Sequence, residues 1–385
     1  MHRIIIIFLS VSNILFLFAQ TEPRIYTQQQ ENAYIFYVDS DFPTEIWLYI
    51  TAKKLINFQA SSMPLYEGLI QKNEIKKYLF QLKRQDNTKS ASYQISSMFT
   101  IGNPLTAHHD NTYTYYFPFE HGTKFKLVQG YHGTFSHTGK NEYAVDFAMP
   151  EGTPICAARA GIVAMVKENS HIGGSSPSYA EQANYIHILH ADGSSGNYVH
   201  LQYQGAVVQI NDHVVSGQLI GYSGNTGFSS GPHLHFSVSL PKKNGSLQSI
   251  PFFFLRYDGQ RISPEENKYY YGFQQGKKPF PVLYGSDLSI ENFKDYRELI
   301  VEDGSIHVTT EQIDDTTIVY IHNGTKKTYS CTVFSKLSNM YSAVFLPVVH
   351  TVPPLSKIFI TLLHPNQKKT PSSYRIYLSY KEIRS

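Results

Sequence analysis

The chain has 385 residues, of which 14% are aromatic and only 16% are charged, and its formal net charge is +3. This length favours two or three domains, and the small, dispersed charge argues against a nucleic-acid partner. Tyr, Phe, Ile and Thr are abundant and long runs of strong helix formers are missing, so the composition predicts a mostly β protein.

Residues 1–20 are predicted to be a secretory signal peptide. A short basic start precedes an apolar stretch, and the small residue Ala19 lies near its end. Because the apolar stretch is close to the minimum spanning length, an uncleaved membrane anchor is the alternative. No cysteine stands directly after the apolar stretch, and this excludes the lipid anchor of bacterial lipoproteins. We expect an exported protein, periplasmic or secreted, without a membrane attachment after cleavage.

Two flanking segments, residues 21–105 and 291–385, share one design. Each has short aromatic runs separated by polar clusters, such as KKYLFQL (76–82) and KIFITLL (357–363). Both segments are therefore predicted to be small β-sandwich-like modules. The alternative is that any antiparallel hairpin produces this pattern. Residues 262–290 are expected to be a linker or a wrapping segment.

The central segment, residues 124–261, is rich in glycine and in β-branched runs separated by turns. Within it, HADGSSG (190–196) separates two strand-like runs and predicts a hairpin loop. Cys156 and Cys331 fall in different predicted domains. We expect two separately buried thiols rather than a disulfide, and no functional role for either.

The stretch GPHLHF (231–236) places two histidines two residues apart in a strand-like context. His233 and His235 then project from one face of the strand, and Leu234 and Phe236 from the other, toward a core. A single histidine in a strand is usually a polar residue on a wet face. Two histidines on one face suit a metal ligand beside a proton-handling group.

Further ligands for a metal are available upstream, in FSHTGKNEYAVDFAMPEG (135–152). Catalytic zinc commonly takes three protein ligands from His, Asp and Glu. His137 lies in a polar loop, and Asp146 interrupts an apolar strand, where a carboxylate is costly unless paired or coordinated. Two alternatives stay open: His132 as the first ligand, and a buried ion pair between Asp146 and Arg159.

Among the other histidines, one is a candidate site residue and the rest are expected to be structural or solvated. In NYVHLQY, strand alternation turns His200 to the same face as Tyr198, opposite Val199. His190 borders a turn and is predicted to be a structural polar group, and His187 has no further support. The AHHD segment (107–110) is predicted to be a solvated loop.

Three ordered motifs together resemble the lysostaphin-type (LytM-like) zinc metallopeptidases, which cleave peptidoglycan cross-links. The motifs are SHTGKNEYAVDFAMPEGTPICAARAGIV, NYVHL and GYSGNTGFSSGPHLHF, and the resemblance covers residues 128 to about 255. It implies a central, compact antiparallel β peptidase domain whose groove holds one Zn²⁺.

Carried over motif by motif, the resemblance implies that His137, Asp146 and His235 are the metal ligands and that His200 and His233 are the catalytic histidines. Many members place the first histidine three residues before the aspartate. Here eight residues separate His137 from Asp146, which resembles a variant of the motif with Ser-His before a short loop.

The expected function is therefore zinc-dependent endopeptidase activity on the peptide cross-links of bacterial peptidoglycan, with a metal-activated water as nucleophile. The alternative is a non-catalytic relative that binds peptidoglycan or activates another cell-wall hydrolase. Such proteins usually lose zinc ligands, whereas all five expected positions are filled here. The partners expected are stem-peptide cross-links and, through the flanking modules, a cell-wall protein.

Overall fold

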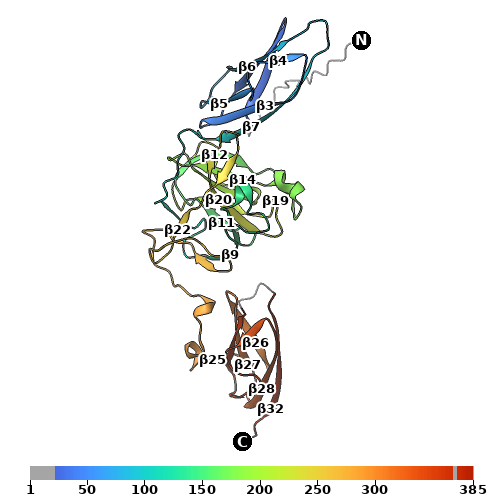
Figure 1. Ribbon diagram of the computed structural model, residues 1–385. Coiled ribbons are helices and arrows are strands. Elements are labelled where there is room, and N and C mark those ends of the chain that lie inside the picture. The colour runs from blue at the N-terminus through green and yellow to red at the C-terminus, as the bar shows by residue number, and fades with distance from the viewer. Residues whose placement is uncertain (1–21, 367–370, 385) are drawn as a thin grey trace. The chain divides into compact units, whose positions relative to one another are not determined.

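The computed structural model describes residues 22–366 and 371–384 of the chain. The chain divides into two compact units, Met1–Lys278 and Pro279–Ser385, whose strands are labelled in Figure 1. The predicted signal peptide lies outside the described residues. The protein is mostly β, as predicted, and the helices of the described part are four short 3-10 turns: Gly139–Asn141, Pro177–Gln182, Gly285–Asp287 and Ile290–Phe293. None of the described helices has the length and hydrophobicity needed to cross a membrane.

The N-terminal part of the first unit consists of two sheets with a shared core. Phe36 and Leu82 from one sheet pack with Leu48 and Ile50 from the other, because alternate side chains of each strand point inward. In strand order, one sheet is β1 (Arg24–Gln30), β2 (Ala33–Asp39), β6 (Lys77–Arg84) and β4 (Phe58–Ala60), and the other is β5 (Tyr66–Ile70), β3 (Ile46–Ile56) and β7 (Ser92–Ile101).

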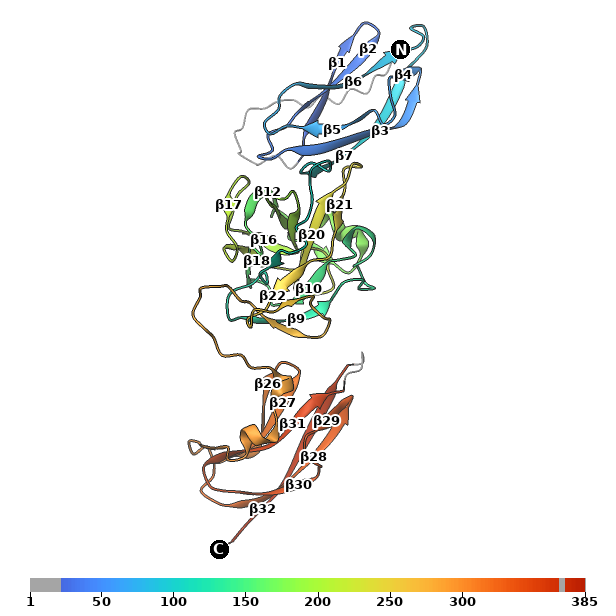
Figure 2. The ribbon, with the colours of Figure 1, turned by 60° about the vertical axis from the view of Figure 1, so that its left-hand side comes forward.

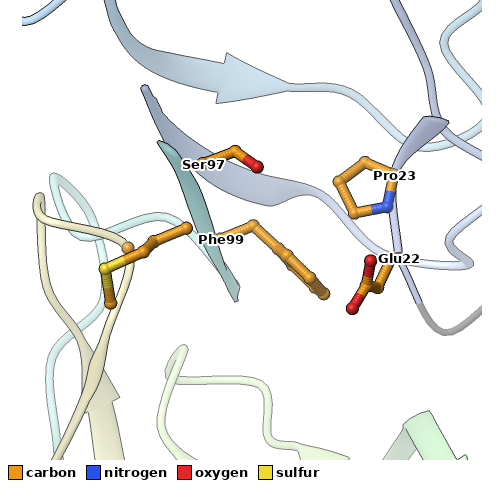
Figure 3. Close-up of a pocket in the computed structure, with 6 residues that line it drawn as sticks. Glu22, Pro23, Ser97 and Phe99 are labelled. Atoms are coloured by element: carbon orange, nitrogen blue, oxygen red, sulfur yellow. The ribbon is translucent and has the colours of Figure 1, made fainter. Parts of the chain in front are cut away.

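Direct contacts join these N-terminal sheets to the central part of the unit. The indole N–H of Trp47 donates to the carbonyl of Lys243, 2.7 Å away. Ala164 is fully buried in the N-terminal core although it belongs to a central strand. Beside this junction, a hollow of about 240 Å³ is lined by residues that include Glu22, Met98 and Gly245 (Figure 3), and none of the candidate site residues lines it.

A nine-stranded sheet forms the centre of the first unit. Its order is β17 (His213–Val214), β12 (Gly161–Lys167), β14 (Tyr185–Leu189), β15 (Ser195–Val199), β20 (His233–Pro241), β10 (Val145–Ala148), β9 (Lys124–Gln129) and β24 (Tyr269–Tyr271), with β21 (Leu247–Ser249) paired to β20. Figure 2 labels its strands β17, β12, β20, β21, β10 and β9. The predicted hairpin loop is confirmed, since β14 and β15 pair antiparallel around it.

Three smaller sheets complete this part of the first unit. They are β11 (Pro154–Cys156), β18 (Leu219–Ser223) and β16 (Leu201–Ala206); β13 (Gly173–Gly174) and β19 (Gly227–Phe228); and β23 (Arg261–Ile262), β22 (Phe253–Leu255) and β8 (Thr114–Tyr115). The core includes Phe117 and Tyr270. It therefore takes in residues on both sides of 124–261, and β24 adds to the central sheet a segment expected to be a linker.

The second unit is also built from two sheets around one core. Val319 and Ile360 from one sheet pack with Cys331 and Val352 from the other. The strands are β25 (Arg297–Leu299), β31 (Ser356–Pro365), β27 (Thr316–Asn323) and β26 (Ile306–Ile313), with β29 (Met340–Ser342) beside β31; and β30 (Val348–Val352), β28 (Tyr329–Ser338) and β32 (Ser373–Glu382).

Two predictions about the flanks can be judged from these strands. The hairpin alternative is wrong, because β6 and β7 lie in different sheets, as do β31 and β32. The polar segment between β6 and β7, residues 85–91, therefore crosses from one sheet to the other. The prediction of two separately buried thiols is confirmed, since Cys156 and Cys331 are both free and buried.

Candidate metal centre

Two neighbouring strands of the central sheet bring Asp146 and His235 together. In the antiparallel pair of β10 and β20, Asp146 lies directly opposite His235. Phe147 and Leu234 are fully buried in the core beneath. The alternation predicted for the HLH stretch is thus confirmed, and it leaves both polar side chains on the face of the sheet opposite the core.

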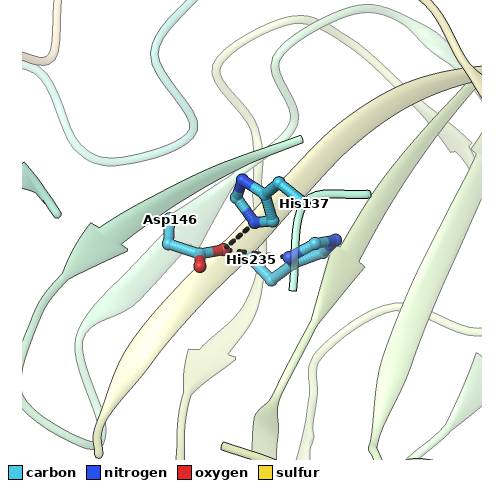
Figure 4. A group of neighbouring side chains, drawn as sticks. All are labelled: His137, Asp146 and His235. Atoms are coloured by element: carbon cyan, nitrogen blue, oxygen red, sulfur yellow. Dashed lines mark hydrogen bonds and ion pairs between the residues drawn. The ribbon is translucent and has the colours of Figure 1, made fainter. Parts of the chain in front are cut away.

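His137 reaches the same point from the loop between β9 and β10. Its ring is fully buried, and its Nδ1 lies 2.8 Å from the carbonyl oxygen of Gly130. Its Nε2 lies 3.1 Å from Asp146 Oδ1, and His235 Nδ1 lies 2.9 Å from the same oxygen. Figure 4 shows the three side chains converging. One ligand atom from each lies within 4.8 Å of the others.

The donor set fits a divalent metal ion. Because His137 donates its Nδ1 proton to a carbonyl, its Nε2 carries a lone pair, and this buried atom has no hydrogen-bond partner. Burial alone would raise the pKa of Asp146, but the contacts from His137 and His235 hold that pKa well below its ordinary value. Two imidazole nitrogens and an ionised carboxylate are a common protein ligand set for catalytic zinc.

The two alternatives from the sequence are not supported. His132 is 60% exposed and pairs with Glu142 at 3.1 Å, and the candidate metal group of the described residues contains His137 instead. The alternative pairing of Asp146 with Arg159 does not occur. Arg159 forms its ion pair with Asp192, at 2.7 Å.

His200 faces the site for a reason that differs from the prediction. Tyr198 is fully buried in the core opposite Phe236, so regular alternation would turn residue 200 toward the core as well. His200 instead has a left-handed backbone with φ of 68°, which ends β15 and reverses the side-chain direction. The predicted common face of Tyr198 and His200 is therefore wrong, while the position of His200 near the site agrees with the motif.

His200 and His233 form a pair of rings beside the candidate ligands. Their centroids are 4.6 Å apart, and the His200 ring lies 5.8 Å from that of His235. Nδ1 of His200 lies 2.6 Å from the Thr226 carbonyl, and Nδ1 of His233 lies 2.8 Å from the Gly231 carbonyl. Both contacts fix the tautomer that leaves Nε2 as a proton acceptor.

Burial sets the charge of His200. It lowers the pKa of this histidine to about 3, and the neighbouring His233 and His235 act in the same direction. His200 is therefore a neutral base at neutral pH. A neutral imidazole can accept a hydrogen bond through its Nε2 from water or from a substrate.

The remaining histidines behave as structural or solvated residues. His190 is buried, and its Nδ1 lies 2.9 Å from the Ala160 carbonyl. His108 is exposed, as predicted, whereas His109 is half-buried and its Nε2 lies 3.1 Å from the hydroxyl of the buried Tyr115. The sequence did not single out Gln129, which contacts Asp146, or Thr226, whose carbonyl orients His200. A backbone carbonyl leaves no mark in a side-chain pattern.

Comparison with known proteins agrees with this geometry. Residues 140–248 match the profile of Peptidase family M23. This segment contains four of the five candidate residues and begins three positions after His137. The central domain belongs to peptidase family M23.

Relatives of this chain include enzymes whose names give different specificities. The chain is 31% identical over 150 residues to the glycyl-glycine endopeptidase ALE-1 of Staphylococcus capitis, covering 39% of this chain and 38% of that protein. It is 35% identical over 108 residues to the peptidoglycan DD-endopeptidase ShyA of Vibrio cholerae, covering 28% and 22%. The match thus spans less than two fifths of either relative.

A solved structure matches the same region. The catalytic domain of lysostaphin from Staphylococcus simulans is 32% identical, with 33% of this chain and 87% of that chain covered and a TM-score of 0.24. The family profile covers residues 140–248, and the flanking sheets lie outside it.

Proposed function

We propose that this protein is a zinc-dependent endopeptidase that hydrolyses the peptide cross-links of bacterial peptidoglycan. His137, Asp146 and His235 would hold the metal, and His200 and His233 would be the catalytic residues. The observation that carries the proposal is the convergence of His137 Nε2 and His235 Nδ1 on Asp146 Oδ1, in a buried group whose ligand atoms all lie within 4.8 Å of one another. Membership of family M23 supports the peptidase class.

The chemistry divides between the metal and the paired histidines. A bound Zn²⁺ supplies Lewis acidity toward water and a substrate carbonyl. Nε2 of His200 and His233 can take the proton of the attacking water and return it to the leaving amine. Because both Nδ1 atoms contact backbone carbonyls, each ring is held with Nε2 as its basic atom. Such fixed orientation lowers the barrier because no reorientation is needed during reaction.

The substrate and the compartment are also part of the proposal. One relative is named for glycyl-glycine bonds and another for DD bonds. We infer direct D-amino-acid cross-links for this chain, and action outside the cytoplasm after removal of residues 1–20. Cell-wall binding by the flanking modules would bring the M23 domain to its substrate.

The test is incubation of residues 21–385 with purified peptidoglycan, once with direct cross-links and once with glycine bridges. Products are identified by mass spectrometry, with and without a zinc chelator. We expect chelator-sensitive loss of directly cross-linked dimers. Cleavage of glycine bridges alone would overturn the substrate, and bound zinc without any cleavage would favour a binding or activating role.

A matched pair of histidine variants sharpens this test. His137→Ala should abolish cleavage, whereas His132→Asn should keep it, because His132 is exposed and paired with Glu142. Asparagine also tolerates the left-handed backbone of position 132, where φ is 59°. Loss of cleavage in His132→Asn but not in His137→Ala would instead make His132 the first metal ligand.

A further inference from the structure

Gln129, at the end of β9, contacts both the strand and the loop of the candidate metal centre. It lies opposite Asp146 in the sheet and is only 9% exposed. Its Nε2 donates to Asp146 Oδ2 at 2.9 Å and to Ser136 Oγ at 2.8 Å, and its Oε1 accepts from the backbone N–H of Phe135 at 3.2 Å. A peptide N–H only donates and an ionised carboxylate only accepts, so the two partners fix the amide orientation.

This amide determines which oxygen of Asp146 faces the histidines. With Oδ2 engaged by Gln129, Oδ1 is the atom that lies 3.1 Å from His137 Nε2 and 2.9 Å from His235 Nδ1. A carboxylate held in this way offers one oxygen rather than two. Hydrogen bonds of this kind orient metal ligands and tune their affinity.

The same amide also fixes the loop that carries His137. Phe135 and Ser136 directly precede His137, and both form hydrogen bonds with the Gln129 side chain. Eight residues separate His137 from Asp146, so chain connectivity alone leaves their relative position loosely defined. We propose that Gln129 is a positioning residue that locks the loop of the first ligand to the strand of the second, and this rests on the proposed metal site.

Gly133 supplies an independent sign that the loop is built around this side chain. A Cβ at position 133 would lie 2.3 Å from Cγ of Gln129, closer than real contacts allow. The carbonyl of Gly133 also accepts from the backbone N–H of His137, at 3.0 Å. The loop therefore passes against Gln129 immediately before it turns to present the ligand.

The first test is the zinc affinity of full chains, measured by competition with a chromophoric chelator. Gln129→Met keeps the side-chain length and removes both polar contacts, and we expect about 10- to 100-fold weaker binding. Gln129→Glu places a second carboxylate beside Asp146 and should weaken binding further. The absorption bands of the Co²⁺ form should change in both variants. Wild-type affinity and spectrum in a folded Gln129→Met protein would overturn the proposal.

A double-mutant cycle separates positioning from general damage to the fold. Gly133→Ala should weaken zinc binding in the wild-type background, because the new methyl group displaces Gln129. In a Gln129→Ala background the space is vacant, and Gly133→Ala should add no further loss. Additive losses would show that Gly133 acts by another route and would overturn the coupling.

The outcomes distinguish this inference from the proposed function. Zinc affinity that depends on Gln129, without cleavage of peptidoglycan, would support the positioning role and contradict the endopeptidase. Cleavage of peptidoglycan by the wild type, with unchanged zinc affinity in Gln129→Met, would support the endopeptidase and contradict the positioning role. Wild-type protein that binds no zinc would overturn both.

Discussion

Two groups of histidine and aspartate in this protein have similar internal distances. In the second unit, His322 Nε2 lies 2.8 Å from Asp303 Oδ2, and the rings of His307 and His322 are 4.6 Å apart. In the first unit, His235 Nδ1 lies 2.9 Å from Asp146 Oδ1. The pairwise distances are therefore alike, but among the described residues only the first group brings three ligand atoms within 4.8 Å of one another.

Burial and hydrogen bonding also distinguish them. The Asp303 side chain is 47% exposed, and its other oxygen accepts from the backbone and hydroxyl of Ser305. Asp146 is 8% exposed, and the Nε2 of His137 that faces it is buried without a hydrogen-bond partner. An unsatisfied buried lone pair is costly unless something occupies it. The comparison teaches that a candidate metal centre is recognised by buried ligand atoms that converge on one point, and less by its composition.

The largest expected effect is on metal binding, and it should be confined to the first group. Asp146→Asn should weaken zinc binding by at least about 100-fold, more than the loss of a residue that only supports a ligand. Asp303→Asn, the matched change in the second unit, should leave zinc content unchanged. Metal analysis after dialysis and competition titration measure both. Equal losses of zinc in the two variants would show that the two groups do not differ in metal binding.

A second prediction separates the ligands from the paired histidines beside them. His200→Ala should retain zinc, because His200 is outside the candidate ligand group, while the cleavage rate falls about 10²- to 10⁴-fold. The rate of dimer loss and the zinc content are measured on the same preparation. Loss of zinc in His200→Ala would instead make this residue a ligand.

A smaller effect, on the stability of the folded protein, is expected from His190. This histidine is buried, as the site histidines are, but it lies outside the candidate metal group. Burial lowers its pKa from 6.5 to about 4. Below pH 6.5 the unfolded chain binds a proton that the folded chain does not. His190 should therefore reduce stability progressively as the pH falls from about 6.5 to about 4, by about 3 kcal/mol in total.

Denaturant unfolding of the first unit at several pH values tests this effect. Glutamine does not titrate, so the unfolding free energy of His190→Gln should fall less steeply over the same pH range. The slope of unfolding free energy against pH should differ from that of the wild type by the contribution of about one bound proton. Parallel pH profiles for wild type and variant would show that His190 does not remain neutral in the folded protein.

Local patterns predicted the parts of the site that depend on one strand. The alternation of His233, Leu234 and His235 has a period of two, and the core takes the apolar member. Asp146 was recognisable because a carboxylate in an apolar strand needs a partner. These inferences use only neighbours in the sequence, and the structure agrees with them.

Features that depend on distant contacts or unusual backbone were missed. The reversal at His200 requires a left-handed φ in a non-glycine residue, which is uncommon and has no side-chain signature. Gln129 acts on residues that lie across a strand pair and a loop. The assignment of β6 and β7 to separate sheets likewise depends on long-range pairing, which short polar turns do not determine.

The core shared across the first unit decides how the protein can be shortened for laboratory work. A fragment limited to residues 124–261 would uncover Ala164, which the N-terminal sheets bury, and would lack Phe117 and Tyr270 from its own core. Aggregation or loss of structure in such a fragment would come from the cut surfaces rather than from the candidate metal centre. Crystallisation and inhibitor screening should therefore start from a fragment that ends at Lys278 and keeps the sheet bearing Trp47.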